Sequence, residues 1–198
     1  DYIDLTGDYL PIVLTFVLGL SFILLTVAFR SIVVPVTAII MNLLSVGAAY
    51  GLVVLVFQKG VGASLLGFQH VEIFEAWVPI FLFSVLFGLS MDYNVFLLTR
   101  IRERFDQTKN SGESVAFGLR TTGGIITGAA LIMVAVFAGF AAGDLVMFQQ
   151  MGFGLAIAVF LDATIIRTVL VPAVMRLLGR RNWYLPGALQ WLPDLRRK

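Results

Sequence analysis

The chain has 198 residues, of which 59% are hydrophobic and only 13% charged, and its mean hydropathy is +0.95. Soluble domains are roughly 45–50% apolar and about 25% charged, so this composition excludes an ordinary soluble domain. The apolar residues fall in blocks of about 20, the length that spans a bilayer as a helix. The absence of cysteine excludes disulfides and thiol chemistry.

Five apolar blocks predict an all-α fold, a polytopic membrane helix bundle of five transmembrane helices. No low-complexity tract or soluble segment separates the blocks, so residues 1–198 are expected to pack as a single domain. The expected spans are, in chain order, about 10–29, 33–57, 77–99, 123–142 and 145–178.

The basic residues predict how the spans are oriented, because lysine and arginine concentrate in cytoplasmic loops. Twelve of the fourteen basic residues fall on one side of the predicted spans, and the only charged residues before the first span are acidic. The N-terminus of the chain is therefore expected outside and the C-terminus in the cytoplasm. An acidic, external start without a signal peptide is difficult to export alone, so we expect the chain to be the C-terminal part of a longer protein.

The third span carries an acid, Asp92, followed directly by Tyr93. Asp92 lies eight residues before Arg100, which is about 12 Å of helix and close to the middle of a hydrocarbon core roughly 30 Å thick. A charge at that depth costs about 2.5–3.5 kcal/mol, and a low dielectric favours the protonated form of a carboxylic acid. Asp92 is therefore a candidate proton carrier, or an acid retained only for packing. Neighbours in sequence point about 100° apart on a helix, so Asp92 and Tyr93 would each need a partner on another helix.

The fifth span contains Asp162 and Arg167, and Pro172 follows. The two charged residues are five apart, so they are not stacked as an i, i+4 pair would be. The proline removes a helical hydrogen bond, so the helix is expected to kink or leave the membrane there. Arg167 would then extend to the headgroups as an interfacial anchor. A secondary role for the pair in proton transfer is the alternative.

The fourth span has a small-residue pattern, with Gly124 and Gly128 in a GxxxG arrangement. Such a face lets membrane helices approach closely, so we expect it to pack against another helix. Thr127 is a candidate hydrogen-bond donor to Asp92 across that contact. Other intramembrane polar groups of the same kind are Asn42, Ser45, Ser84, Ser90 and Asn94.

The stretch "FGLSMDYNVFLLTRIRERF" at 87–105 resembles the MMPL (mycobacterial membrane protein large) branch of the resistance-nodulation-division transporters. The stretches at 27–58, 118–140 and 152–179, the last reading "GFGLAIAVFLDATIIRTVLVPAVMRLLG", carry the same resemblance. Together they cover most of the chain and match the C-terminal transmembrane half of that family.

The resemblance implies a proton-driven exporter of lipids, lipid-linked compounds or hydrophobic drugs in the bacterial plasma membrane. It places Asp92 and Tyr93 in a proton relay with an Asp-Tyr pair of the N-terminal half, which would be the main partner. Membrane lipids and a lipid or hydrophobic small molecule are the other expected partners. We expect no enzyme activity, no cofactor other than the proton gradient as energy source, no metal and no nucleic-acid partner.

Two other functions fit parts of the pattern. An intramembrane aspartyl protease needs two facing acids, and Asp92 and Asp162 supply the number, but "GLSMDY" lacks the GxGD arrangement of that class. A lipid- or sterol-sensing bundle of the same superfamily would use Asp92 only for packing. Function would then tolerate replacement of Asp92 but not of the small face on the fourth span.

Overall fold

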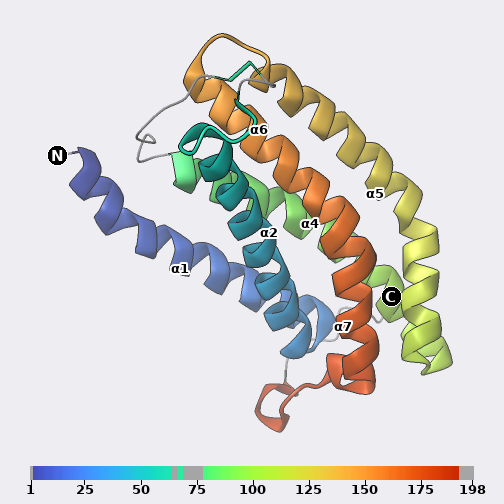
Figure 1. Ribbon diagram of the computed structural model, residues 1–198. Coiled ribbons are helices and arrows are strands. Elements are labelled where there is room, and N and C mark those ends of the chain that lie inside the picture. Colours follow the sequence, from blue (N-terminus) through green and yellow to red (C-terminus); the bar gives the residue numbers. More distant parts are fainter. Residues whose placement is uncertain (1, 64–66, 69–77, 192–198) are drawn as a thin grey trace.

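The computed structural model describes residues 2–63, 67–68 and 78–191, and the regular secondary structure in these ranges is entirely helical. Five of the helices are long and apolar enough to cross a membrane. The prediction of an all-α membrane bundle is therefore confirmed. Figure 1 shows the long helices running side by side, with α1 diverging from the others toward the N-terminus. Three of the basic residues on which the predicted orientation rests, Arg196, Arg197 and Lys198, lie outside the described residues.

Three of the helices, α1, α4 and α5, are longer than the predicted apolar spans, since each continues into charged sequence beyond its hydrophobic stretch. The last span consists of three consecutive helical segments, α6, η1 and α7, without an interruption between them. The bounds are α1 Tyr2–Phe29, α2 Val33–Phe57, α4 Val78–Thr108, α5 Ser111–Ala141, α6 Val146–Leu161, η1 Asp162–Leu170 and α7 Val171–Leu178. Short 3₁₀ turns follow at Gly179–Trp183 and Gly187–Leu189.

Two tight turns at one end of the bundle rest on local side-chain chemistry. Arg30 ends α1 with a φ of 49°, and the hydroxyl of Ser31 then accepts hydrogen bonds from the first backbone N–H groups of α2. Lys109 ends α4 with a φ of 54°, and the Asn110 side chain accepts the N–H of Glu113 at the start of α5. These side chains satisfy donors that a helix start leaves unpaired.

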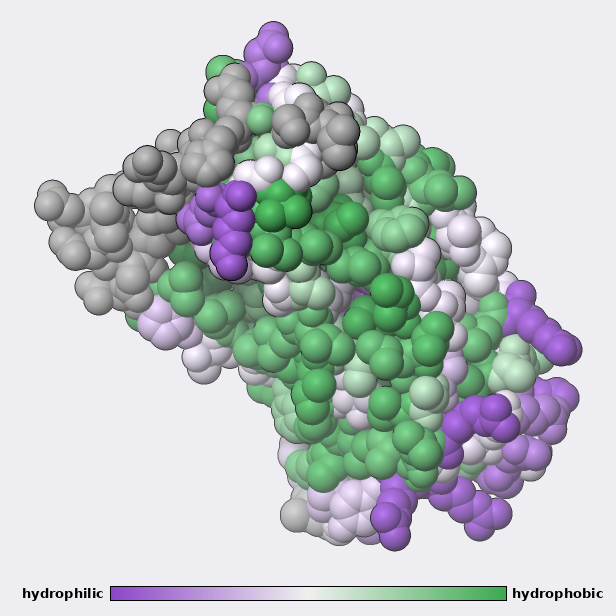
Figure 2. Space-filling model, viewed as in Figure 1, coloured by the Kyte–Doolittle hydropathy of each residue, from purple (hydrophilic) through white to green (hydrophobic). Residues whose placement is uncertain are grey.

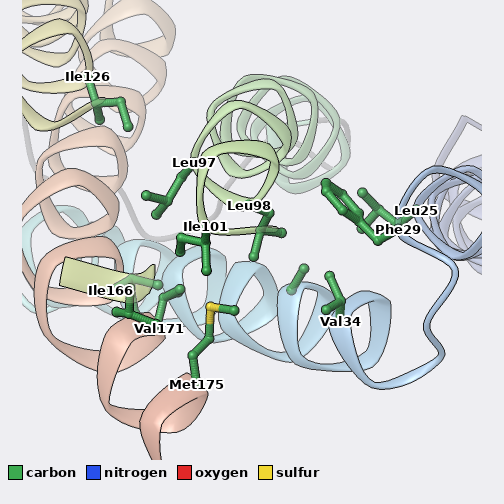
Figure 3. Close-up of a cluster of buried hydrophobic side chains, with 12 residues drawn as sticks. Leu25, Phe29, Val34, Leu97, Leu98, Ile101, Ile126, Ile166, Val171 and Met175 are labelled. Atoms are coloured by element: carbon green, nitrogen blue, oxygen red, sulfur yellow. The ribbon is translucent and has the colours of Figure 1, made fainter. Parts of the chain in front are cut away.

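The interior divides into apolar clusters that follow one another along the bundle. The first lies where α1 ends, α2 begins, α4 ends, α5 begins and α7 ends, and we call this the basic end of the molecule. Figure 3 shows its side chains, with Leu97, Leu98 and Ile101 of α4 lying among those of η1, α7 and α1. A second cluster lies farther along the bundle. Its buried members are Ala49, Val78, Leu82, Leu86, Ala130, Leu155, Ala158 and Val159.

The outer surface is apolar along the middle of the bundle. Large hydrophobic side chains are exposed on α1, α2, α5 and the last span, among them Phe16 at 67% and Ile132 at 67% exposed. Figure 2 shows a continuous hydrophobic band over this region, with hydrophilic residues gathered mainly beyond it at the basic end. This distribution suits a surface in contact with lipid or with other membrane helices.

Close helix packing depends on Gly118 and Gly152 rather than on the predicted GxxxG face. A Cβ on Gly118 would lie 2.4 Å from Ile101 Cγ1, and a Cβ on Gly152 would lie 2.4 Å from the backbone nitrogen of Ala141. Gly124 and Gly128 have nothing within 4 Å of such a Cβ, so no described helix of the chain packs there. The prediction of a helix contact at Gly124 and Gly128 is therefore wrong within this chain.

Replacement of Gly152 by alanine is expected to destabilise the α5–α6 contact. The new methyl group would meet backbone atoms of Phe137, Phe140 and Ala141, which cannot move aside as a flexible side chain would. Overpacking of this kind costs about 1–3 kcal/mol. Thermal unfolding of the purified full-length protein measures the loss. Gly139→Ala on α5 is the matched control, since it has open space around the new methyl group. Equal stability of the two variants would contradict the prediction.

Candidate functional site

The helix α4 presents two chemically different faces at its centre. Ser90 and Asn94, four residues apart, are both buried and point into the bundle. Asp92 lies between them in sequence, about 200° around the helix from Ser90, and is exposed on the opposite face. Gly88 shares that face one turn away and has open space around it. In the described part of the chain, no hydrogen bond or ion pair reaches Asp92.

Tyr93 is directed away from Asp92, as the sequence predicted, and its partners lie on two other helices. The phenol hydroxyl donates to Met133 Sδ on α5 at 3.6 Å. The guanidinium carbon of Arg167 lies 5.2 Å from the centroid of the tyrosine ring, a cation–π contact from η1. Tyr93 is thereby the residue that joins the Asp-Tyr motif to the interior of the bundle.

A buried set of polar side chains joins α2, α4 and η1, and we call it the polar network: Asn42, Ser90, Asn94, Asp162 and Arg167. The hydroxyl of Ser90 lies 2.7 Å from Asn42 Oδ1 and 3.1 Å from Asp162 Oδ2. Asn94 donates to the same Asn42 oxygen at 3.0 Å. The network lies between the two apolar clusters, about halfway along the bundle.

An ion pair forms the centre of the polar network. Arg167 Nη2 lies 2.6 Å from Asp162 Oδ2 and also donates to the backbone oxygen of Ser90 at 3.1 Å. The Arg167 side chain is only 2% exposed. A membrane interior is costly for either charge alone, and a paired, hydrogen-bonded arrangement reduces that cost.

The prediction that Asp162 and Arg167 are not stacked and that Arg167 extends to the headgroups is wrong, because Arg167 is buried in an ion pair with Asp162 and η1 is a π-helix. Its hydrogen bonds connect residues five apart, so Asp162 and Arg167 lie one above the other on one face. The last span also continues as a helix past Pro172, which lies in the first turn of α7. Pro172 has no N–H to donate to the preceding turn, and the helix continues past it at the point where the π-helix η1 changes to the α-helix α7.

The polar network has unused hydrogen-bonding capacity next to a small cavity. In the described part of the chain, Asn42 Nδ2, Asp162 Oδ1 and Arg167 Nε are buried without a hydrogen-bond partner. The cavity has a volume of about 20 Å³ and is lined by network residues together with Tyr93 and Met133. A water molecule needs about 10–15 Å³ and several polar partners, and this site offers both.

Thr127 lies apart from these groups. It is exposed on α5, and no described hydrogen bond joins it to Asp92. The predicted donor contact across the helix pair is therefore not made within this chain. Ser45, another polar residue noted in the sequence, hydrogen-bonds to the backbone oxygen of Ala158 at 3.4 Å and so only links α2 to α6.

No group of three or more histidine, cysteine, aspartate or glutamate side chains capable of holding a metal occurs among the described residues. The chemistry available at mid-bundle is therefore that of an acid, an ion pair, a phenol, amides and a hydroxyl. Such groups are able to accept, donate and pass protons, and the exposed position of Asp92 leaves its carboxylate open to a group outside this chain.

Comparison with known proteins agrees with the motif. The MMPL family model matches residues 1–194. The chain is 46% identical over 195 residues to "Heme uptake protein MmpL11" of Mycobacterium tuberculosis and 44% identical over 195 residues to "Mycolic acid-containing lipids exporter MmpL11" of Mycolicibacterium smegmatis. It is 37% identical over 198 residues to "Trehalose monomycolate exporter MmpL3" of Mycolicibacterium smegmatis.

These alignments cover 98% of this chain for both MmpL11 proteins and 100% for MmpL3, but only 20%, 20% and 19% of the three relatives. The chain thus spans about a fifth of the length of the curated relatives it matches. Both the family match and the identities extend over its five helical spans. This chain has five helices that are able to span a membrane and belongs to the MMPL family.

Proposed function

We propose that this chain is the C-terminal membrane half of a proton-driven MMPL exporter, in which Asp92 and Tyr93 are part of the proton relay. The observation that carries the proposal is the position of Asp92 on α4. It is an acid in the middle of an apolar span, exposed on a face of the bundle where described residues offer it no partner. An acid so placed suits a second membrane half that supplies the other proton-carrying groups.

The polar network supports a second step inside the half itself. Ser90 has one hydroxyl proton and two acceptors within reach, Asn42 Oδ1 and Asp162 Oδ2, so it donates to only one of them at a time. Protonation of Asp162 would reverse the direction of its hydrogen bond with Ser90 and weaken its attraction to Arg167. Such a change is a local event able to bias the packing of α2, α4 and η1.

The two parts are connected through Tyr93. Its ring contacts Arg167, and its backbone position directly follows that of Asp92. A change in the charge of Asp92 would therefore be transmitted over one residue of α4 to the ring that covers the buried ion pair. In this proposal Asp92 exchanges protons with the N-terminal half, and Asp162 and Arg167 respond within this half.

The cargo in this proposal is a lipid or another hydrophobic compound, exported across a bacterial plasma membrane. Two relatives are named as exporters, one of mycolic acid-containing lipids and one of trehalose monomycolate, and a third is named for haem uptake. The basic end faces the cytoplasm, because arginine and lysine gather where α1, α4 and α7 end. The N-terminus of the chain then lies outside.

The geometry gives less support to the two alternatives. A protease dyad requires two carboxyls that share a proton, whereas Asp162 is buried in an ion pair and Asp92 is exposed on the other face of α4. A sensing bundle would need Asp92 only for packing, yet the side chain is exposed and makes no hydrogen bond or ion pair with a described residue. Neither alternative explains an unpaired acid at mid-span.

The proposal is tested with the full-length protein in proteoliposomes that enclose a pH-sensitive dye. Trehalose monomycolate and haem, the cargoes named for relatives, are supplied in separate experiments under an imposed proton gradient. We expect cargo-dependent proton flux and movement of at least one cargo, both abolished by a protonophore. Movement at the same rate without a gradient would contradict the proton-driven function.

A further inference from the structure

A concave, arginine-lined surface lies at the basic end, well away from the polar network. We call it the arginine pocket, and its lining residues are Arg30, Arg102, Arg180, Arg181, Trp183, Tyr184, Leu185 and Gln190. They come from three parts of the chain: the turn between α1 and α2, the end of α4, and the segment after α7. Their convergence is a product of folding, since no short stretch of sequence contains all four arginines.

Hydrogen bonds join two of the three parts of the arginine pocket, the α1–α2 turn and the segment after α7. The hydroxyl of Ser31, fully buried, donates to the backbone oxygen of Asn182 at 2.5 Å. The Asn182 side chain, also buried, donates to the backbone oxygens of Met175 and Gly179 at 2.6 and 2.7 Å. The backbone N–H of Ile32 donates to the oxygen of Tyr184 at 3.2 Å. The segment after α7 is thus fixed against the α1–α2 turn.

The same contacts orient the arginines. Arg30 adopts a left-handed backbone conformation, uncommon for a residue with a side chain, and its guanidinium donates to the backbone oxygen of Gln190 at 3.1 Å. The guanidinium of Arg102 stacks over the ring of Trp183 at 4.4 Å and pairs with Asp106 at 3.2 Å. A strained turn and a stacked cation indicate that the positions of these charges are specified.

Arg180 and Arg181 supply charge that the described part of the chain does not neutralise. Both are exposed, and no described carboxylate forms an ion pair with either. Asp106 offsets part of the charge of Arg102. The surface is therefore strongly attractive to an anion, and guanidinium groups match the geometry of phosphate oxygens better than an ammonium group does.

The depth of the arginine pocket matches the level of lipid headgroups. The apolar part of α1 ends at Phe29, directly before Arg30. Tyr184 is 56% exposed and Trp191, directly after the pocket residue Gln190, is 76% exposed. Aromatic side chains with a polar group are enriched at the membrane–water boundary. An anion in this pocket would have apolar surface on one side and water on the other, which suits an amphiphile.

We propose that the arginine pocket binds the phosphate group of an anionic membrane phospholipid. Arg180 and Arg181 provide the principal charge, Arg30 and Arg102 close the pocket from the other two parts of the chain, and Trp183 and Tyr184 lie alongside the glycerol region. Bound lipid would connect the ends of α1, α4 and α7. Because the site lies apart from Asp92 and the polar network, it does not depend on the relay proposed above.

The experiment measures the retention of phosphatidylglycerol by the full-length protein in mixed detergent micelles, using native mass spectrometry over a range of lipid concentrations. Arg180→Gln/Arg181→Gln is expected to weaken binding about 30-fold, because each arginine near an anionic surface contributes roughly fivefold. Arg181→Gln alone should weaken phosphatidylglycerol binding roughly fivefold. Phosphatidylcholine, which has the phosphate but no net charge, should bind weakly to both proteins.

The matched control is Arg120→Gln/Arg176→Gln, which removes two exposed arginines from the same end of the molecule but outside the pocket. Unchanged phosphatidylglycerol binding by this variant supports a defined site. A loss of binding as large as that of Arg180→Gln/Arg181→Gln would overturn the proposal, because general charge attraction would then explain both results. Glycerol phosphate is added as a soluble competitor. Displacement of phosphatidylglycerol at equal concentration would overturn the lipid assignment, and no displacement supports it.

Discussion

Replacement of Asp92 by asparagine in the full-length protein is expected to abolish proton-coupled transport while leaving the bundle folded. Asparagine has nearly the same shape and cannot take up or release a proton at physiological pH. Asp92 is exposed on α4 and makes no hydrogen bond or ion pair with a described residue, so its replacement removes no such interaction among them. Proton transfer by a positioned side chain contributes about 10²–10⁴-fold, so we expect a loss of at least about 100-fold.

Cargo movement and proton flux in proteoliposomes measure this loss, and thermal unfolding shows whether the fold is retained. Asp144→Asn is the matched control, because it makes the same chemical change at an exposed residue between α5 and α6. Its transport should equal that of the unmodified protein. Substantial proton-coupled transport by the Asp92 variant would contradict the role of Asp92 in the proton relay. Asp92 would then have only the packing role that the sensing-bundle alternative assigns to it.

The overall fold was predictable from the sequence because hydropathy alone determines where spans lie. A helix in a membrane satisfies all its backbone groups internally, so roughly 20 apolar residues have few other structures available. The second expected span, 33–57, agrees with α2 at both ends. Hydropathy alone did not predict the end of α4 or the start of α5, since both lie in charged sequence where hydropathy carries no signal.

The divergence of Asp92 and Tyr93 was also predictable, because a regular helix separates neighbours by about 100°. Which of the two faces the interior was not, since that depends on the packing of α5 and η1 around α4. The signal was present in part: Ser90 and Asn94 are four apart and therefore mark one polar face. Their common acceptor, Asn42, lies on another helix and has no local signature in the sequence.

The ion pair of Asp162 and Arg167 was missed because the spacing was judged against the α-helical period. In an α-helix, residues five apart diverge, whereas in the π-helix of η1 they lie on one face. Nothing in the local sequence announces a π-helix. Likewise, the GxxxG spacing of Gly124 and Gly128 predicted a close helix contact. The glycines that make close contacts with other helices are instead Gly118 and Gly152, which are not part of a GxxxG pattern.

Replacement of Arg167 by methionine is expected to cause the largest loss of stability of any single change in the polar network. It leaves the buried carboxylate of Asp162 without its cation, 2.6 Å from where Nη2 had been. Breaking a buried pair by removing one partner costs about 3–5 kcal/mol, because an uncompensated charge remains in the interior. Arg176→Met, which removes an exposed arginine from α7, is the control and should change the unfolding temperature little.

The double variant Asp162→Leu/Arg167→Met separates stability from function. Replacing both members of a buried pair by apolar residues is often neutral or stabilising, so the unfolding temperature should recover most of the loss. Ser90 would still donate to Asn42 at 2.7 Å, which leaves its hydroxyl satisfied. If the pair takes part in proton coupling, this folded double variant will not transport. Transport at the unmodified rate would assign the pair to packing and leave Asp92 as the proton-carrying group of this half.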